Sequence, residues 1–336
     1  MSNNDIDSLT DALSSQNCTI ANGRDLLSDP GLAQLRRYVP VLAVIAAPYA
    51  GLGGDQDPLN PLDRVAEWRL LLDTLAETTR QQTKASTPLA LVRMVPPTAA
   101  RLAEALQVGG ADAFRVVHFV CHGERDMLYL EDDNGYEAYA VAEHIVGMFG
   151  PGQVRLVVMD GCFSRRIAEL LTEQTSVEAV VGTRRKISPE NARTFNARFY
   201  AAISTGQSIR QAYRAALAEL EARPEGQADR YDLFIRDRLD DMTLPMPALE
   251  LRAERPLISD GMPPLTGVPQ PLGFVGQREP LAALAQDIPS SGHRLYAIYG
   301  EAGIGKSWLA AEYAGRFAWR FPDGVLWFQV TAQTTA

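Results

Sequence analysis

Short apolar runs alternate with longer amphipathic stretches from residue 38 to about residue 222. Apolar runs of this length predict strands, and apolar residues at helical spacing predict helices. The predicted strands are 39–47, 89–95, 114–121, 154–160 and 177–182. The predicted helices are 61–80, 97–106, 164–172, 188–204 and 207–222. Because the strands are apolar on both faces, the pattern predicts an α/β fold, with a mostly parallel sheet and helices on both sides.

One segment departs from this alternation. In residues 126–139, Leu128 and Leu130 alternate with polar positions on either side of the turn sequence at 133–135, Asp-Asn-Gly. Apolar alternation around such a turn is typical of a β-hairpin. We therefore expect a hairpin inserted directly after the third strand.

Prolines mark a change of organisation near residue 240. Seven of them lie between residues 240 and 273 with little periodicity, which predicts an extended linker. A helix at 279–287, a strand at 294–299, a helix at 306–317 and a strand at 324–330 then predict the start of a second α/β domain. The expected divisions are an arm (1–37), a first domain (38–239), a linker (240–272) and an incomplete second domain (273–336). Since later strands of the second domain are missing, we expect the chain to be part of a longer protein.

Composition narrows the class of protein. Of the 336 residues 46% are hydrophobic and 22% charged, which predicts a folded globular chain. With 32 Lys and Arg against 41 Asp and Glu, the net charge is -9, which argues against nucleic acid as the main partner. No apolar run approaches the roughly 20 residues that span a bilayer. Three cysteines and the polar start of the chain favour a reduced, cytoplasmic protein without a membrane partner.

A glycine-rich motif lies between the predicted strand 294–299 and the predicted helix 306–317. Gly300, Gly303, Gly305, Lys306 and Ser307 fit the pattern G-x-x-x-x-G-K-[ST]. In such a loop the glycines turn backbone N–H groups toward a phosphate, the lysine reaches the β- and γ-phosphates, and the serine binds Mg²⁺. The sequence therefore predicts that ATP or ADP binds here with Mg²⁺.

Hydrolysis of ATP needs more than this loop. An acidic residue at the end of another strand must hold Mg²⁺, and a further group must position the attacking water. The predicted strand 324–330 follows the loop and ends without an aspartate. We therefore expect no ATP hydrolysis by this chain alone.

A histidine and a cysteine follow two of the predicted parallel strands. His122 and Gly123 come after the strand 114–121, and Gly161 and Cys162 come after the strand 154–160. Ligands in open parallel sheets bind beyond the carboxyl ends of the strands, so these residues are candidates for one site. A neighbouring imidazole and a following helix both favour the thiolate form of a cysteine. The pair is a candidate for nucleophilic catalysis.

Other readings of nearby residues remain open. His118, in the middle of its strand, is expected to be a core histidine, and Cys121 a small buried hydrophobic residue. Cys121 and His122 point to opposite faces of a strand, which suits tetrahedral zinc ligation poorly. Asp160 either contributes to a substrate pocket for a basic residue or simply ends its strand.

The two blocks resemble a known family of peptidases. Residues 116–123 read VVHFVCHG and residues 156–164 read LVVMDGCFS, which resemble the His-Gly and Cys blocks of the CHAT family, caspase-like cysteine peptidases related to separase. The resemblance covers roughly residues 38–222 and implies a protein or peptide substrate. It implies that Cys162 is the nucleophile, that His122 is the base, and that N–H groups of Gly123 and Cys162 form the oxyanion hole. Many CHAT sequences have Asn-Ala before the cysteine; the Asp-Gly found here resembles separase in its glycine.

A second resemblance concerns the C-terminal part. Residues 271–279 read PLGFVGQRE and resemble the entry to STAND (NB-ARC-type) signalling NTPases. By this resemblance the nucleotide module would regulate the peptidase in a prokaryotic-type signalling or defence switch, with oligomerisation through the NTPase. The alternative is a catalytically silent CHAT-like interaction platform whose main activity is regulated nucleotide binding.

Overall fold

The computed structural model describes most of the chain. It covers residues 19–20, 33–51, 62–81, 86–107, 114–124, 126–150, 154–162, 165–236, 242–244, 246–247, 252–270, 274 and 276–330. For residues 19–20 and 161–162 it describes the backbone alone. No helix among these residues combines the length and the apolar composition that a membrane span requires.

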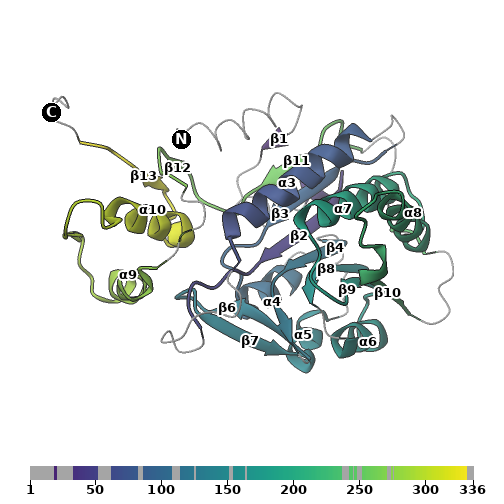
Figure 1. Cartoon of the computed structure of the whole chain (residues 1–336), viewed down its shortest axis with the longest axis horizontal. Helices are drawn as coiled ribbons and strands as arrows, with labels where there is room; N and C mark the ends of the chain where they lie inside the picture. The colour runs from purple at the N-terminus through teal and green to yellow at the C-terminus, as the bar shows by residue number, and fades with distance from the viewer. Residues whose placement is uncertain are drawn as a thin grey trace.

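The predicted parallel sheet is present and forms the centre of the molecule (Figure 1). Its strand order is β1-β11-β3-β2-β4-β8-β9-β10, and all neighbours are parallel except β9 and β10. The strands are β1 (Thr19–Ile20), β2 (Val39–Ile45), β3 (Leu89–Arg93), β4 (Val116–Val120), β8 (Leu156–Cys162), β9 (Ala179–Thr183), β10 (Tyr231–Ile235) and β11 (Leu257–Ser259).

Three helices cover one face of the sheet: α3 (Arg64–Arg80), α7 (Pro189–Ser204) and α8 (Ile209–Glu221). Helix α3 begins where the Asp63 carboxylate accepts hydrogen bonds from the N–H groups of Val65 and Ala66. Helix α8 begins with a reciprocal capping box between Ser208 and Gln211. These helices bury a hydrophobic cluster against alternate residues of the strands.

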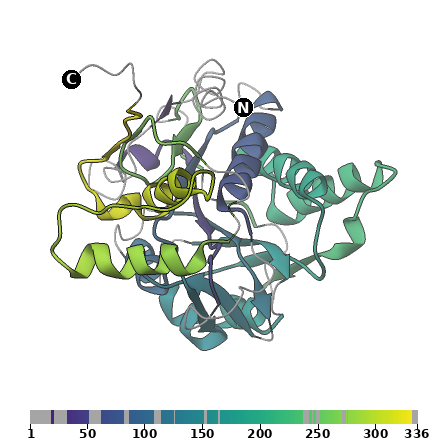
Figure 2. The same cartoon turned by 60° about the vertical axis from the view of Figure 1, so that its left-hand side comes forward.

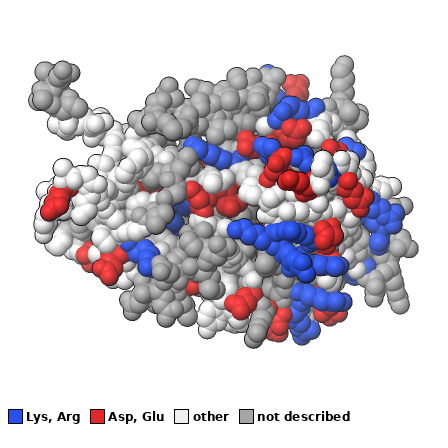
Figure 3. Space-filling model, viewed as in Figure 1, with Lys and Arg blue, Asp and Glu red and all other residues white. Residues whose placement is uncertain are grey.

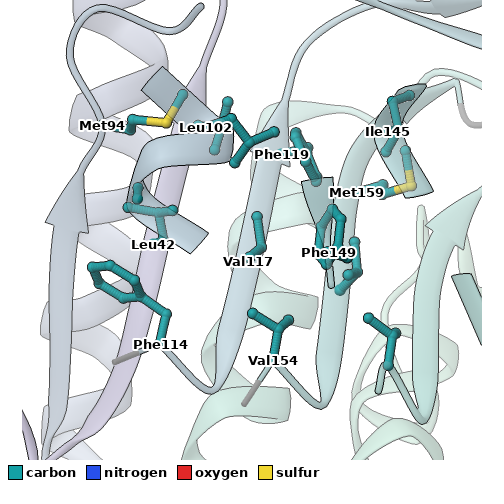
Figure 4. Close-up of a cluster of buried hydrophobic side chains, with 14 of the residues drawn as sticks. Leu42, Met94, Leu102, Phe114, Val117, Phe119, Ile145, Phe149, Val154 and Met159 are labelled. Carbon is teal, nitrogen blue, oxygen red and sulfur yellow. The ribbon is translucent and has the colours of Figure 1, made fainter. Parts of the chain in front are cut away.

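The opposite face carries α4 (Ala99–Gln107), α5 (Ala142–Met148) and α6 (Arg165–Gln174). Figure 4 shows their side chains meeting those of the strands in a second cluster, with Leu102 and Ile145 from the helices beside Val117, Phe119 and Met159. Val117 and Phe119 alternate with residues of the first face, as the period of a strand requires. A sheet buried on both faces explains the continuous apolar runs of the sequence.

The predicted hairpin lies between β4 and α5. It consists of β5 (Gly123–Glu124), β6 (Met127–Glu131) and β7 (Glu137–Val141) in an antiparallel sheet of its own. Its turn contains Gly135 with φ +80°, and a Cβ there would lie 2.8 Å from Cε1 of Tyr49. Glycine is therefore required at this turn both by the backbone and by the close approach of the tyrosine ring.

Two segments expected to lie outside the first domain add strands to its sheet. β11 falls within the expected linker 240–272, pairs with β3, and buries Leu257 and Ile258. β1 falls within the expected arm 1–37 and pairs with β11. The prolines around β11 hid it from the sequence pattern, and a strand of three residues is too short to show periodicity. The linker is thus partly built into the core of the sheet.

The C-terminal part contains α9 (Arg278–Ser290) and α10 (Lys306–Phe317), which match the two expected helices, and the turn η5 (Ala318–Arg320), which was not expected. The expected strand at 294–299 is wrong: these residues form no strand, and Leu295 and Tyr299 are 88% and 92% exposed. A buried parallel strand needs neighbours that take its backbone hydrogen bonds, and no described strand pairs with this segment. The expected strand at 324–330 shortens to β13 (Val325–Leu326), which pairs with β12 (Leu265–Thr266).

Helices α9 and α10 pack against the first domain (38–239). The contact lies at the end of the sheet where β2 finishes, as Figures 1 and 2 both show. An apolar cluster places Tyr49 and Tyr136 among side chains of the two helices, including Leu281, Leu309 and Phe317. Gln286 of α9 also donates a hydrogen bond of 2.9 Å to the Tyr136 hydroxyl. The contact therefore combines buried apolar area with specific polar pairs.

Four buried charged side chains hold the same contact together. Arg316 of α10 donates to Glu131 at the end of β6 (3.2 Å) and to Glu312 (3.1 Å). Arg64 donates to the other oxygen of Glu312 at 3.2 Å. Glu131 accepts a further hydrogen bond from the N–H of Ala47. We call Arg64, Glu131, Glu312 and Arg316 the ionic cluster; its side chains are at most 8% exposed.

Acidic and basic side chains are mixed on the face of the molecule that Figure 3 shows. The face viewed in Figure 3 carries Lys and Arg next to Asp and Glu. The net charge of -9 is therefore not a uniformly acidic layer over that face.

Candidate active site

His122 and Cys162 lie at the carboxyl ends of two central strands that are neighbours in the sheet. β4 and β8 are parallel neighbours, with Val120 opposite Asp160. His122 follows Val120 by two residues, and Cys162 follows Asp160 by two. Adjacent strands lie about 4.8 Å apart, so the backbones at Val120 and Asp160, two residues before His122 and Cys162, are close. β5, which begins at the residue after His122, lies against β8.

The hairpin fixes the backbone around His122. The His122 carbonyl accepts a hydrogen bond of 2.9 Å from the N–H of Tyr129, and Gly123 pairs with Leu128. His122 is half-buried. The backbone of the candidate base is therefore paired with the hairpin strand β6.

Cys162 is the last residue of β8. Its backbone pairs with Thr183 of β9, beyond an irregularity in the register that begins after Val158. Helix α6 starts at Arg165, three residues later, which is close to the expected start at residue 164. The positive end of a helix so near in the chain favours the thiolate of a preceding cysteine.

Asp160 does not end its strand, since β8 continues to Cys162. Its side chain is 11% exposed and takes part in a buried polar network. Oδ2 of Asp160 accepts from Nε2 of His118 at 2.9 Å and from Nδ2 of Asn196 at 2.6 Å. Nδ1 of His118 lies 2.8 Å from the hydroxyl of Tyr200. Because an ionised carboxylate only accepts, Nε2 of His118 carries a proton and donates it to Asp160.

Sequence reasoning missed three residues of this neighbourhood. Asn196 and Tyr200 are four residues apart on α7, so they share one face of the helix. Glu67 comes from the first turn of α3; burial, and then the negative charges of Asp160 and Asp63, raise the pKa of its carboxyl to about 7. The helical spacing of Asn196 and Tyr200 was the one sequence feature that could have placed them together. No feature of the sequence pointed to Glu67.

His118 and Cys121 were expected to be buried residues without a catalytic role, and both are buried. His118 is 0% exposed and hydrogen-bonded through both ring nitrogens, which is a core histidine. Cys121 is buried, and burial raises the pKa of its thiol to about 12. Cys121 is therefore protonated at neutral pH and cannot act as a nucleophile.

The glycine-rich loop fits a phosphate group in part. Gly300, Gly303 and Gly305 all have positive φ, and α10 begins at Lys306 as the motif requires. Nζ of Lys306 donates to the carbonyls of Gly300 (3.1 Å) and Glu301 (2.7 Å) of its own loop. The lysine thus lies over the loop where phosphate oxygens would take its hydrogen bonds. The preceding strand of the motif is absent from this region, as described above.

Comparisons with solved structures find distant similarities. One is a secreted C11 cysteine protease from Bacteroides thetaiotaomicron in complex with an irreversible peptide inhibitor, with 10% identity, a TM-score of 0.37, and 60% of this chain and 67% of that chain covered. Another is described as a protease, with 12% identity, a TM-score of 0.38, and 74% and 55% covered. A third is the complex of the pro- and mature domains of RgpB from Porphyromonas gingivalis, with 12% identity, a TM-score of 0.36, and 63% and 50% covered.

No curated protein matches the sequence. The family model described as the CHAT domain matches residues 14–235, which is more than half of the chain. That span contains β4, β8 and both strand ends at which His122 and Cys162 lie. The chain belongs to the CHAT domain family.

Proposed function

We propose that this chain is a cysteine endopeptidase of the CHAT type, with Cys162 as nucleophile and His122 as general base and acid. The observation that carries the proposal is the parallel register of β4 and β8, which pairs Val120 with Asp160, the residues two positions before His122 and Cys162. Membership of the CHAT family supports it. The substrate would be a protein or peptide.

The chemistry follows from these two groups. The Cys162 thiolate attacks the carbonyl carbon of the scissile bond, and N–H groups of Gly123 and Cys162 are proposed to hold the developing oxyanion. Protonated His122 gives its proton to the leaving amine, and the C–N bond breaks to leave a thioester. Water then gives a proton to His122 and attacks the thioester, and the C–S bond breaks to release the acid and to restore the Cys162 thiolate beside protonated His122.

Labelling of the intact protein with iodoacetamide tests the proposal. At pH 7 we expect alkylation at Cys162 with a rate above that of a free cysteine, because the paired thiolate is the reactive form. Cys121 should stay unlabelled, since it is buried and has a raised pKa. Mass spectrometry locates the adduct, and Cys162→Ala is the matched control.

Cleavage of peptides separates the peptidase from the platform alternative. A pooled peptide library incubated with the wild type should yield products that Cys162→Ala does not produce. Slow labelling of Cys162 together with an uncleaved library would favour an interaction platform. Cleavage that persists in Cys162→Ala would show that another residue is the nucleophile.

We further propose that residues 300–307 bind ATP or ADP with Mg²⁺. The positive φ angles of the three glycines, and the start of α10 at Lys306, support this proposal. Lys306 would donate to the β- and γ-phosphates and Ser307 would bind Mg²⁺. No hydrolysis by this chain alone is proposed.

Affinity for ADP and ATP, measured by calorimetry on the full chain, tests this site. Lys306→Ala should weaken binding about 10- to 100-fold, because a charge-assisted hydrogen bond to phosphate is lost. Ser307→Ala should weaken binding only when Mg²⁺ is present, which provides the matched control. Equal affinities in the wild type and Lys306→Ala would overturn the assignment.

We also propose that the C-terminal part regulates the peptidase as a STAND-type module in a signalling or defence switch. Helix α10 begins at the glycine-rich loop and carries Glu312 and Arg316 of the ionic cluster. Glu131 of the cluster ends β6, and β6 pairs with β5 directly after His122. A ligand at the loop would therefore act on the helix that contacts the hairpin of the base. Oligomerisation through this module remains a prediction.

A further inference from the structure

The backbone of Cys162 belongs to a row of paired residues that continues across the sheet. Cys162 pairs with Thr183 of β9, and Thr183 pairs with Tyr231 of β10. β9 ends at Thr183, whereas the antiparallel β10 begins at Tyr231. Just beyond this row, the N–H of Arg184 donates to the carbonyl of Arg230 at 2.7 Å. Both arginines therefore lie at the edge of the sheet where β8 ends at Cys162.

Cationic residues follow or precede the strand ends of this row. Three of them follow β9, one precedes β10, and two begin α6, directly after the Cys162 segment. All are exposed except the half-buried Arg230. Figure 3 shows Lys and Arg side chains gathered over the part of the molecule in which Figure 1 draws β8, β9 and α6. We call these six residues the basic rim: Arg165, Arg166, Arg184, Arg185, Lys186 and Arg230.

Specific contacts hold the segments of the basic rim together. The guanidinium of Arg230 donates to the carbonyl of Lys186 at 2.5 Å. The guanidinium carbon of Arg165 lies 5.7 Å from the centroid of the Phe234 ring on β10. The start of α6, the segment after β9 and the strand β10 are thus linked by these cationic side chains.

The unpaired positive charge of the basic rim lies in part of its side chains. Arg184 donates to Asp232 through two nitrogens, and Arg165 donates to Glu169. Arg166 and Arg185, by contrast, form no ion pair with any residue that the structure describes.

Two further carboxyl groups lie within electrostatic reach of the basic rim. Asp229 acts on Arg184, and Glu67 acts on Lys186. Neither forms an ion pair with the basic rim among the described residues. Exposed cations without a partner are available to an acidic ligand, and they stand out on a chain of net charge -9.

We propose that the basic rim binds acidic residues of the substrate, glutamate or aspartate, in the chain that flanks the scissile bond; this rests on the peptidase function proposed above. β9 lies one strand from β8 and β10 lies two strands away, or about 5 and 10 Å. An extended peptide advances about 3.3 Å per residue, so the acidic residues would lie roughly two to four positions from the scissile bond. Guanidinium groups match carboxylates in charge and geometry.

Two matched fluorogenic peptides test this substrate class. A sequence that the wild type cleaves in a pooled peptide library is made with glutamates in the flank, or with glutamines in their place. At low salt we expect kcat/KM for the glutamate peptide to be about tenfold higher, because opposite charges speed the encounter. At about 1 M salt the ratio should approach one. Equal kcat/KM values at low salt would overturn the proposal.

Charge reversal assigns the preference to the basic rim. In Arg185→Glu combined with Lys186→Glu, the ratio of kcat/KM for glutamate over glutamine should fall below one, since the flank is then repelled. Both side chains are exposed, so the fold should tolerate the change. Arg185→Gln combined with Lys186→Gln removes the charges without reversing them and should bring the ratio close to one.

A matched control changes the net charge equally at another place. Arg210→Glu combined with Arg214→Glu lies on α8, which follows the end of α7. At that end the carbonyl of Ser204 accepts from the N–H of Thr87, just before β3 begins, so this part of α8 lies toward the opposite edge of the sheet. The control should keep the wild-type ratio. An equal fall in both double variants would show that net charge, rather than the basic rim, sets the preference.

A binding measurement separates failure of this inference from failure of the proposed function. Fluorescence anisotropy follows a labelled peptide of about ten glutamates on Cys162→Ala at low salt. Binding that is lost on charge reversal of Arg185 and Lys186 would support the basic rim even if no peptide were cleaved. Cleavage that depends on Cys162 but not on a glutamate flank would contradict the basic rim alone.

A labelled oligothymidylate of about ten nucleotides tests the other polyanion that a cationic surface attracts. The net charge of -9 opposes nucleic acid, so we expect weaker binding than for the glutamate peptide. Tighter binding of the oligonucleotide, lost in the same charge reversal, would overturn the assignment to acidic peptides.

Discussion

His122→Ala is expected to lower kcat/KM for a cleaved peptide by about 10²- to 10⁴-fold, while the free energy of unfolding stays within about 0.5 kcal/mol of the wild type. Its imidazole is half-buried and lies beyond the end of β4, so little packing is lost. The proton transfer that we propose for His122 would then have to come from water. Steady-state kinetics and urea unfolding on the same samples measure both quantities.

His118→Ala is the matched control, because it removes a second histidine four residues earlier in the chain. It leaves the Asp160 carboxylate and the Tyr200 hydroxyl buried without their shared partner. We expect unfolding free energy to fall by about 3 kcal/mol. If His118→Ala abolished cleavage without loss of stability, and His122→Ala did not, the roles assigned to the two histidines would be reversed.

Arg316→Met is expected to destabilise the contact between α10 and the first domain by about 3–5 kcal/mol. The variant leaves the carboxylates of Glu131 and Glu312 buried. Glu312 keeps a cationic partner in Arg64, whereas Glu131 keeps only the N–H of Ala47. It also removes the guanidinium that lies 5.2 Å from the centroid of the Tyr49 ring. Urea unfolding, followed by limited proteolysis of α9 and α10, measures the loss.

Arg101→Met serves as the control for Arg316→Met. Arg101 pairs with Glu104 at the surface of α4, where both side chains are partly exposed. Loss of such a pair changes stability by about 1 kcal/mol at most. Equal effects of the two variants would mean that the ionic cluster does not hold α10 in place.

The parallel strands and their helices could be predicted because each carries its own pattern. Strands buried on both faces show continuous apolar runs, and α3, α7 and α8 show helical spacing or caps. The hairpin was predicted from alternation and from the turn at Gly135. β1, β10 and β11 were not predicted, since they are short or lie at the edges of the sheet, and only pairing with a neighbour makes them strands. The strand expected at 294–299 shows the converse: an apolar run without a partner strand stays irregular.

Sequence alone determined the composition of the candidate dyad, the glycine-rich motif, and the two strand ends at which His122 and Cys162 lie. These features are local, so the order of residues suffices to read them. Tertiary structure alone decided that Asp160 accepts hydrogen bonds from His118 and Asn196, and that α10 meets the hairpin through Arg316. Those contacts join residues from 36 to 185 positions apart. Burial and charge at such a distance depend on how strands and helices pack, which the local pattern of the chain does not encode.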